Sequence, residues 1–354
     1  MDLLKETTQL LEHLPQAVFL VKDNTIVYVN HNARARGVQL DTAVASLITI
    51  GLVEYEQFTS GKLMLTTTVS GLCYNTVVST MGDYHLFCLE SEFSDPELRA
   101  FALASNVLRD PLSASMLSIE RLIPEEAIQN SPQLLAEVKK LNKDLHQICK
   151  AVRNMADVAA IASGSNKESR DVVGLVTEWV EKSNTLLEKT GHRIVLKTLK
   201  HPAYCQVNAE KLERAFLNLI SNAVKHANTP GTIEVSLNMC SGKLYLSVEG
   251  VCDDPQAIVS SGLFSRFKRE PSLDDYQSGI GLGLTITHGI AAAHKGTLLV
   301  DQPKDNRIRF TLSLSTHTPG VLTVNSPTIR IINDGGHDQF LIELADILPP
   351  DLYE

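Results

Sequence analysis

The feature that most constrains the fold is a run of apolar residues spaced three and four apart across residues 97–163. In its second half these positions are Leu134, Val138, Leu141, Leu145, Ile148, Val152, Met155, Ala159 and Ala162. The first half repeats the spacing at Leu108, Leu112, Ser115, Ile119 and Leu122, and residues 124–132 supply a turn. Such heptad spacing is typical of helical bundles. We therefore predict an antiparallel hairpin that pairs with a second copy as a four-helix bundle.

Residues 1–91 have the period of β-strands. The stretch AVFLVKDNTIVYVN holds two β-branched runs separated by Lys22-Asp23-Asn24, a tripeptide suited to a hairpin turn. Further strand-like runs are interrupted at Ser70-Gly71 and at residues 81–83. This pattern predicts a small antiparallel sheet with helices to one side.

Residues 170–315 return to mixed helices and strands, so the chain is expected to be an α+β multidomain protein. A long helix is predicted over NAEKLERAFLNLISNAVKHA, with Asn208 as its N-cap, and two strands are predicted to turn at Ser241-Gly242. Residues 316–354 are expected to form an extra strand pair (GVLTV, TIRII), a break at two glycines and an apolar tail.

Composition excludes several classes of function. The net charge of −9 argues against a nucleic-acid or anionic-membrane partner. The six cysteines form no CxxC pair and fit no zinc spacing, so we interpret them as buried thiols of a cytosolic protein. Apolar runs fall far short of the roughly 20 residues that a membrane span needs. The expectation is a cytoplasmic protein without a membrane span.

Two asparagines on the long predicted helix are candidates for a site. Asn218 and Asn222 are four residues apart and therefore share a face, and Lys225 and His226 follow one turn later. An amide oxygen can bind Mg²⁺ and a lysine can neutralise phosphate. The alternative is a pair of solvated asparagines on a surface helix.

A glycine-rich run is the second candidate element. Gly279, Gly281 and Gly283 precede an apolar helix, where backbone N–H groups can approach phosphates. The spacing matches neither a Walker loop nor a dinucleotide-binding fingerprint. A flexible hinge is the alternative.

These elements together resemble the ATP-binding domain of sensor histidine kinases over residues 208–315. LNLISNAVKHA resembles the N box of that family, LFSRFKRE with Phe264 and Phe267 the F box, and GIGLGL the second glycine box. ASNVLRDPL resembles the H box that begins the dimerisation hairpin, and LLEHLPQAVFLVKDNTIVYVNHNARARGV resembles the opening of a PAS sensor domain. The resemblance covers about residues 1–315 and leaves the C-terminal region outside.

The resemblance implies an arrangement of domains, ligands and partners. The domains would be a PAS-like sensor (1–91), a dimerisation hairpin (97–163), an α/β-sandwich ATP-binding domain (170–315) and a C-terminal extension (316–354). ATP and Mg²⁺ would be the cofactors. The partners would be a second copy or another histidine kinase, in a homodimer or heterodimer, and a response regulator.

The resemblance also assigns roles to individual residues. Asn222 would coordinate Mg²⁺ with support from Asn218, and Lys225 and His226 would face the phosphates. The glycines at 279, 281 and 283 would line the lid, which Phe264 and Phe267 would pack and position.

The sequence departs from the family pattern at the H box. The family has a histidine followed by an acidic residue, and this chain has Asn106 and Val107 there. An amide nitrogen is not a nucleophile and valine accepts no proton, so the chain is predicted not to phosphorylate itself. Asp110 lies where phosphatases of the family carry Thr or Asn, and its charge would repel an acyl phosphate. His146 is interpreted as a solvated bundle histidine rather than a substitute acceptor.

The first glycine box, Asp-x-Gly-x-Gly, is altered as well. Counting without gaps places Gly250 where the adenine-binding aspartate belongs, with Cys252 and Asp254 at the glycines. A shift of three residues makes Asp253 the aspartate, but leaves Pro255 and Ala257 at the glycines. Loss of one charge-assisted hydrogen bond costs about 1.5–3 kcal/mol, which lowers ATP affinity roughly ten- to hundredfold.

Three hypotheses follow from these departures. The first is a non-catalytic family member that signals by conformation, by pairing with an active kinase or by holding a response regulator. The second is an enzyme that still binds ATP and phosphorylates a partner kinase's histidine in trans. The third, a freestanding ATP-driven machine of the same superfamily, agrees poorly with the kinase-like hairpin.

Overall fold

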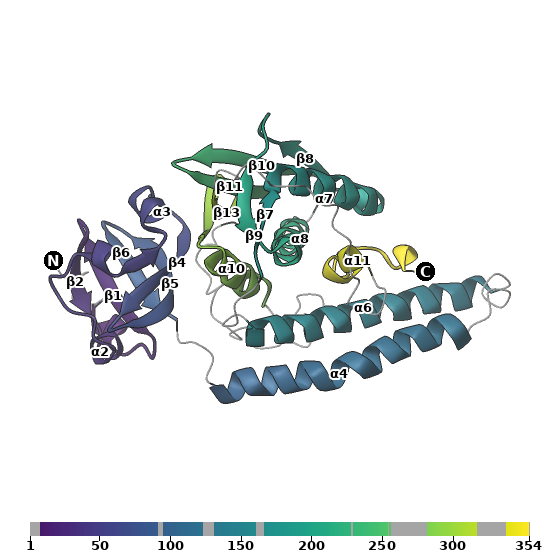
Figure 1. Ribbon diagram of the computed structural model, residues 1–354, viewed down its shortest axis with the longest axis horizontal. Helices are drawn as coiled ribbons and strands as arrows, with labels where there is room; N and C mark the ends of the chain where they lie inside the picture. The colour runs from purple at the N-terminus through teal and green to yellow at the C-terminus, as the bar shows by residue number, and fades with distance from the viewer. Residues whose placement is uncertain are drawn as a thin grey trace.

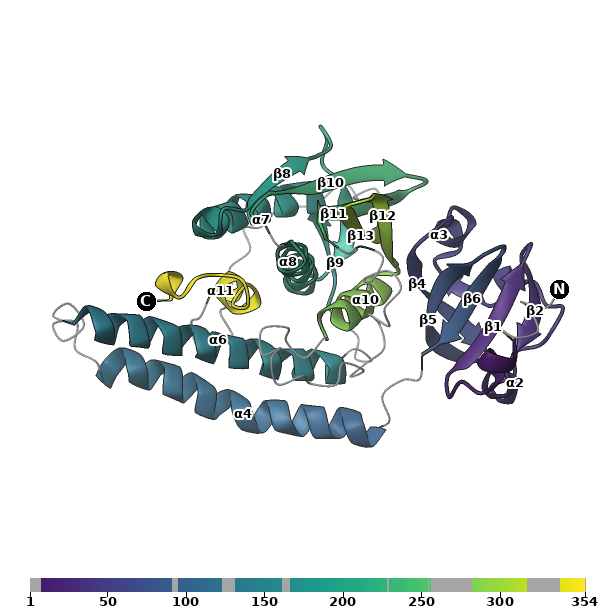
Figure 2. The same cartoon turned by 180° about the vertical axis from the view of Figure 1, so that it is seen from behind.

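The computed structural model describes residues 8–90, 95–122, 131–160, 166–227, 229–253, 255, 282–316 and 338–353. Figure 1 shows an N-terminal sheet, two long helices lying side by side, and a second sheet with helices beneath it. The C-terminal residues lie between the long helices and the second sheet, as the view from behind in Figure 2 also shows.

The N-terminal sheet is built from antiparallel hairpins, as the sequence predicts. Its turn at Asp23 and Asn24 has φ of 47° and 64°, the left-handed values that a two-residue hairpin turn requires. The strands are ordered β2-β1-β6-β5-β4, and Phe19 stacks on Phe87 in the core at 4.9 Å between ring centroids. The elements are β1 (Ala17–Lys22), β2 (Thr25–Val29), α2 (His31–Ala35), η1 (Val44–Ser46), β3 (Ile48–Ile50), α3 (Leu52–Glu56), β4 (Lys62–Val69), β5 (Leu72–Met81) and β6 (Tyr84–Leu89).

The two long helices form the antiparallel pair that the heptad pattern predicts. They are α4 (Asp95–Leu122) and α6 (Pro132–Ala160), packed along their length. The heptad positions divide into two groups, because Val138 and Val152 are buried while a second series, with Leu134, Leu141 and Ile148 seven residues apart, is exposed. The exposed fractions of that second group are 38% for Leu134, 46% for Leu141 and 47% for Ile148. A pair of helices therefore buries only part of the predicted seam.

The second unit is an α/β layer pair in which α7, α8 and α10 cover one face of the sheet (Figure 1). Its strands are ordered β12-β13-β11-β10-β8, and Trp179 packs against Phe216 in its core at 5.7 Å between ring centroids. The elements are β7 (Glu168–Asp171), α7 (Val172–Leu187), η2 (Glu188–Thr190), β8 (Arg193–Lys197), β9 (Tyr204–Val207), α8 (Ala209–Lys225), β10 (Thr232–Cys240), β11 (Lys243–Val251), α10 (Gly283–Ala293), β12 (Leu298–Lys304) and β13 (Arg307–Ser315).

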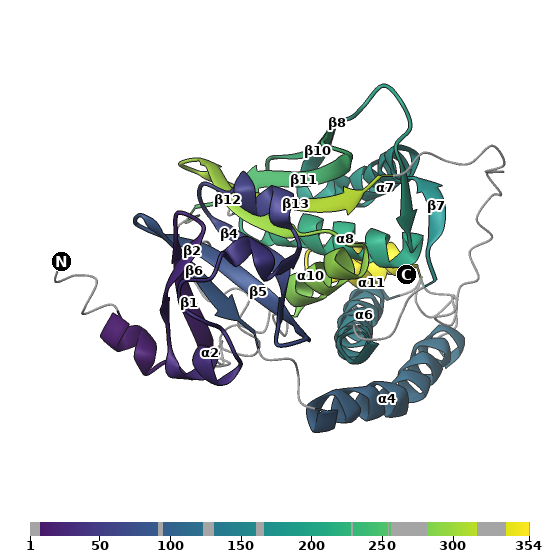
Figure 3. The ribbon, with the colours of Figure 1, turned by 60° about the vertical axis from the view of Figure 1, so that its left-hand side comes forward.

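The two sheets join edge to edge through β4 and β12, a contact that sequence analysis missed. Leu298 lies opposite Met64 and Val300 opposite Lys62, so these two sheets form one 11-stranded sheet, while β7 and β9 pair separately (Figure 3). Lys243 adds an ion pair, with its Nζ 2.7 Å from the Glu54 carboxylate. The N-terminal sheet is thus coupled to the second unit by backbone hydrogen bonds as well as by the chain.

The C-terminal residues form α11 (Gln339–Glu343) and η3 (Pro350–Leu352). Phe340, Leu344 and Tyr353 are fully buried against the second unit and α6. The strand pair expected from GVLTV and TIRII lies outside the described residues.

Gly61 allows the close approach of the two sheets and offers a test of their junction. Its φ is +92°, and a Cβ atom there would lie 2.3 Å from the Val300 carbonyl oxygen. Gly71 has a similar φ of +82° with nothing within 4 Å of its Cβ position, so Gly71→Ala is a matched control. We expect Gly61→Ala to lower the free energy of unfolding by about 1–3 kcal/mol more than Gly71→Ala in urea titrations. Equal losses would show that the junction does not form.

Candidate functional site

Helix α8 begins at the cap that the sequence predicts. The Asn208 side chain accepts a hydrogen bond from the Lys211 backbone N–H at 2.9 Å, as an N-cap residue does. The Asn208 backbone N–H in turn donates to His294 Nε2 at 2.9 Å. Since His294 is the C-cap residue of α10, this bond holds the start of α8 against the end of α10.

The two asparagines of α8 differ in exposure, because Asn218 lies in the interior of the second unit and Asn222 is half-buried. Asn218 is only 3% exposed, so the surface-helix alternative is wrong for this residue. Within the described part of the chain, neither Asn218 Nδ2 nor Asn222 Nδ2 has a hydrogen-bond partner. A buried amide without a partner costs about 1–3 kcal/mol, which favours a polar ligand at these side chains.

Gly283, the first residue of α10, lies directly beside Asn218. A Cβ atom at Gly283 would be 3.3 Å from Asn218 Oδ1, so the glycine keeps this approach open. Gly279 and Gly281, and Phe264 and Phe267, lie outside the described residues, and their roles stay predictions.

The donors present are compatible with a magnesium–nucleotide ligand. Unpartnered amide N–H groups suit phosphate oxygens, and an amide oxygen is a suitable ligand for Mg²⁺. Among the described residues no cluster of three His, Cys, Asp or Glu side chains is placed to hold a metal ion.

Lys225 does not point to open space at the end of α8. Its Nζ lies 2.7 Å from Asp346 Oδ2 in the C-terminal residues. Lys150 of α6 contacts the same oxygen at 2.7 Å. Burial alone would raise the pKa of Asp346, but the two lysines outweigh it and the pKa is lowered. His226 is the C-cap of α8, where its backbone N–H donates to Asn222 O at 3.1 Å.

Gly250 lies in β11 directly beneath α8. A Cβ atom at this position would lie 3.2 Å from the Ala223 Cβ, so a side chain here would point toward the asparagine helix. Asp253, the alternative aspartate, is exposed, and Cys252 is buried. Of the two ways of counting the first glycine box, the one without gaps therefore directs its residue toward α8.

The exposure of the cysteines corrects the sequence interpretation. Cys205 and Cys252 are buried as expected, but Cys73 and Cys240 are exposed because they lie on the strands β5 and β10 with their side chains on the surface.

The residues at the H-box positions are on the surface of α4. Asn106 is exposed and Val107 is 61% exposed, and Asp110 one turn later is exposed too. His146 of α6 is not solvated, which corrects the sequence interpretation. Its Nδ1 contacts Asn142 O at 2.7 Å, and its ring packs edge-on against Tyr353 at 4.8 Å, because the C-terminal residues cover this face of α6.

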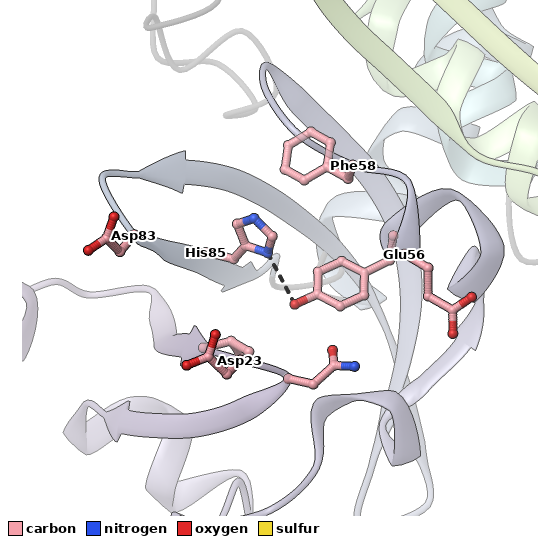
Figure 4. A pocket seen from close by; sticks show the side chains of 8 residues that line it. Asp23, Glu56, Phe58, Asp83 and His85 are labelled. Atoms are coloured by element: carbon pink, nitrogen blue, oxygen red, sulfur yellow. Dashed lines mark hydrogen bonds between the residues drawn. The ribbon is translucent and has the colours of Figure 1, made fainter.

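A cavity of about 320 Å³ in the N-terminal sheet was not identified from the sequence (Figure 4). At its centre His85 Nδ1 lies 3.1 Å from the Tyr55 hydroxyl. Burial raises the pKa of Tyr55 to about 12 and lowers the pKa of His85. The sequence did contain a signal for this cavity, because the turns predicted at residues 22–24 and 81–83 each carry an aspartate. These two residues, Asp23 and Asp83, both line the cavity. The cavity is lined by Val21, Asp23, Asn24, Tyr55, Glu56, Phe58, Asp83 and His85.

The length and apolar character of the helices can be compared with what a membrane span requires. In the parts of the chain that the structure describes, no helix combines the length and apolar character needed to cross a bilayer.

Comparison with known proteins identifies the second unit. Residues 207–316 match the family described as histidine kinase-, DNA gyrase B-, and HSP90-like ATPase. Over 224 residues the chain is 26% identical to adaptive-response sensory kinase SasA of Synechococcus sp. (strain JA-3-3Ab), covering 60% of this chain and 58% of SasA. Over 186 residues it is 30% identical to sensor protein RstB of Escherichia coli (strain K12), covering 50% and 41%.

Among solved structures, full-length ShkA in complex with AMPPNP is 20% identical with a TM-score of 0.48, covering 62% of this chain and 46% of ShkA. The chain spans about half the length of the curated relatives named above. The ordered motifs around α8 and α10 and the matched ATPase family agree with each other. Residues 207–316 are thus a histidine kinase-type ATPase domain, and the chain is similar to sensor histidine kinases over 50–60% of its length.

Proposed function

We propose that this chain is a two-component signalling protein that does not phosphorylate its own hairpin and that signals through its conformation or through heterodimerisation with a histidine kinase. One observation carries the proposal. The exposed residues on α4 at the family's acceptor and acidic positions are Asn106 and Val107.

The chemistry of these two side chains supports the proposal directly. Transfer of a γ-phosphoryl group to the hairpin needs a nucleophilic nitrogen and a neighbouring group that takes its proton. The amide of Asn106 has its lone pair delocalised into the carbonyl, and Val107 has no basic atom. Both residues are accessible on α4, so the lack of reaction comes from their chemistry and not from burial.

Signalling by conformation requires a second hairpin as a binding partner, and the exposed apolar residues of α4 and α6 favour such a pairing. Leu134, Leu141 and Ile148 repeat every seventh residue along the outer side of α6. Leu103 and Val107 are exposed on α4. A heptad stripe left outside the hairpin is the surface that a four-helix bundle buries. The occupant is a second copy of this chain or the matching hairpin of an active kinase.

The N-terminal unit would act as a PAS-like sensor domain in this proposal. The expected boundaries are 1–91 for the sensor, 97–163 for the hairpin and 170–315 for the ATP-binding domain. Because β4 pairs with β12, a change in the sensor sheet would reach the ATPase sheet through hydrogen-bonded strands.

The alternative function is an ATP-dependent kinase that phosphorylates the histidine of a partner in trans. The unpartnered amides of Asn218 and Asn222 favour it, since they are suited to hold a nucleotide phosphate and its Mg²⁺. ATP would supply the phosphoryl group. Asn222 would ligate the metal, Asn218 would support it, and Lys225, His226 and the glycines at 279, 281 and 283 would contact the phosphates. Gly250 lacks the carboxylate that binds adenine in the family.

Calorimetry with a non-hydrolysable ATP analogue and Mg²⁺ separates the two functions. We expect weak binding that Asn222→Ala abolishes, because the metal would lose its amide ligand. Gly250→Asp should tighten binding roughly ten- to hundredfold over Gly250→Ala, which introduces the same crowding against Ala223 without the carboxylate. No binding by the native chain or by Gly250→Asp would exclude the kinase alternative and leave the conformational one.

The proposed dimer is tested by placing a charge among the exposed heptad residues of α6. We expect Leu141→Glu to raise the dimer dissociation constant by about a hundredfold or more in sedimentation experiments, because each copy would bury an unpaired carboxylate. Lys140→Glu introduces the same group one position away, about 100° around the helix, and should leave the dimer intact. Equal effects of the two variants would contradict the proposed interface.

A further inference from the structure

The C-terminal segment, residues 338–353, is wedged between the hairpin and the ATPase domain (Figure 1). Its apolar side chains belong to the same hydrophobic core as α7 and α8. Tyr353 also packs on His146 of α6. The segment is therefore in contact with both units at once. Its deeply buried apolar residues are Phe340, Ile342, Leu344, Ala345, Leu348 and Tyr353.

Asp346 bridges the two units by charge. Its Oδ2 accepts from Lys150 of α6 and from Lys225 of α8, each at 2.7 Å. Lys150 also donates to the Glu343 backbone carbonyl at 2.6 Å. All three charged side chains are largely buried, so water screens the attraction only weakly.

Glu343 forms a second bridge of the same kind. Its fully buried carboxylate accepts from Arg214 Nε of α8 at 2.9 Å, and Arg153 of α6 lies 4.0 Å away. Arg214 also pairs with Asp157 of α6. Asp346 and Glu343 thus each lie against one cation from the hairpin and one from the ATPase domain.

We propose that the C-terminal segment is an intramolecular clamp that holds the ATPase domain against α6 and engages Lys225 through Asp346. The part that concerns Lys225 rests on the proposed nucleotide site. A phosphate at Lys225 and the Asp346 carboxylate would compete for one ammonium group. By linkage, a ligand that takes Lys225 weakens the clamp, and a loosened clamp strengthens that ligand. A signal that releases the clamp would therefore free the ATPase domain from α6 and make the Lys225 ammonium group available to a phosphate.

The clamp is tested by measuring the distance between the two units in the full chain without nucleotide. Spin labels carried by unnatural side chains at the exposed positions Glu137 of α6 and Asn238 of β10 report this distance by double electron–electron resonance. Excess unlabelled chain removes signals between copies. We expect one narrow distribution for the native chain. D346K, which would place three ammonium groups together, should add a second, more distant population.

D351K is the matched control, because Asp351 is an exposed carboxylate of the same segment. It should reproduce the native distribution. A folded D346K chain with an unchanged distribution would overturn the clamp. If D346K does not fold, D346N removes only the charge, and the same comparison applies: a broadened distribution supports the clamp and an unchanged one overturns it.

Nucleotide affinity gives an independent second readout. D346N should bind a Mg²⁺–ATP analogue at least about fivefold more tightly than the native chain, while D351N should not. Unchanged affinity in a chain that does bind would overturn the competition for Lys225. An absence of binding in every variant would refute the proposed nucleotide site, and the distance measurement would still decide the clamp.

Discussion

The burial of α8 is the constraint on which the rest of the structure depends. Its apolar side, including Leu212, Phe216 and Ile220, is fully buried under the sheet. The polar side chains of α8 therefore lie against α10, α6 and the C-terminal segment, where Arg214 pairs with the carboxylates of Asp157 and Glu343. Asn218 is held in the interior by the same packing, although its amide nitrogen has no partner among the described residues. A helix packed in this way positions the candidate nucleotide site and the charged bridges together.

In our proposal, the parts of the chain keep the positions they have in a histidine kinase while one chemical step is missing. The hairpin presents exposed heptad residues, and the ATPase domain directs Asn218 toward Gly283. The sequence resemblance predicts the differences from the family at two places, the pair of side chains at 106 and 107 and the glycine at 250. Our proposal therefore assigns the output to movement and association of the domains, with the edge pairing of β4 and β12 as the structural connection to the N-terminal sheet.

Local features of the fold were predictable, and long-range contacts were not. The turns at Asp23-Asn24 and Ser241-Gly242 and the Asn208 cap follow from residue types that act within a few positions. The β4–β12 pairing was missed because edge strands carry no local signal for their partner. The partner of Lys225, 121 residues along the chain, was missed for the same reason. The burial of His146 depends on the C-terminal segment, so helical periodicity alone indicated the wrong environment.

The central claim is that Asn106 and Val107 prevent self-phosphorylation, and it has one direct test. The purified full chain is incubated with Mg²⁺ and ATP labelled on its γ-phosphate, and bound label is then assayed for stability in acid and in alkali. Phosphohistidine is lost in acid and retained in alkali. The account predicts no such label on the chain. Acid-labile, alkali-stable label on the native protein would contradict it.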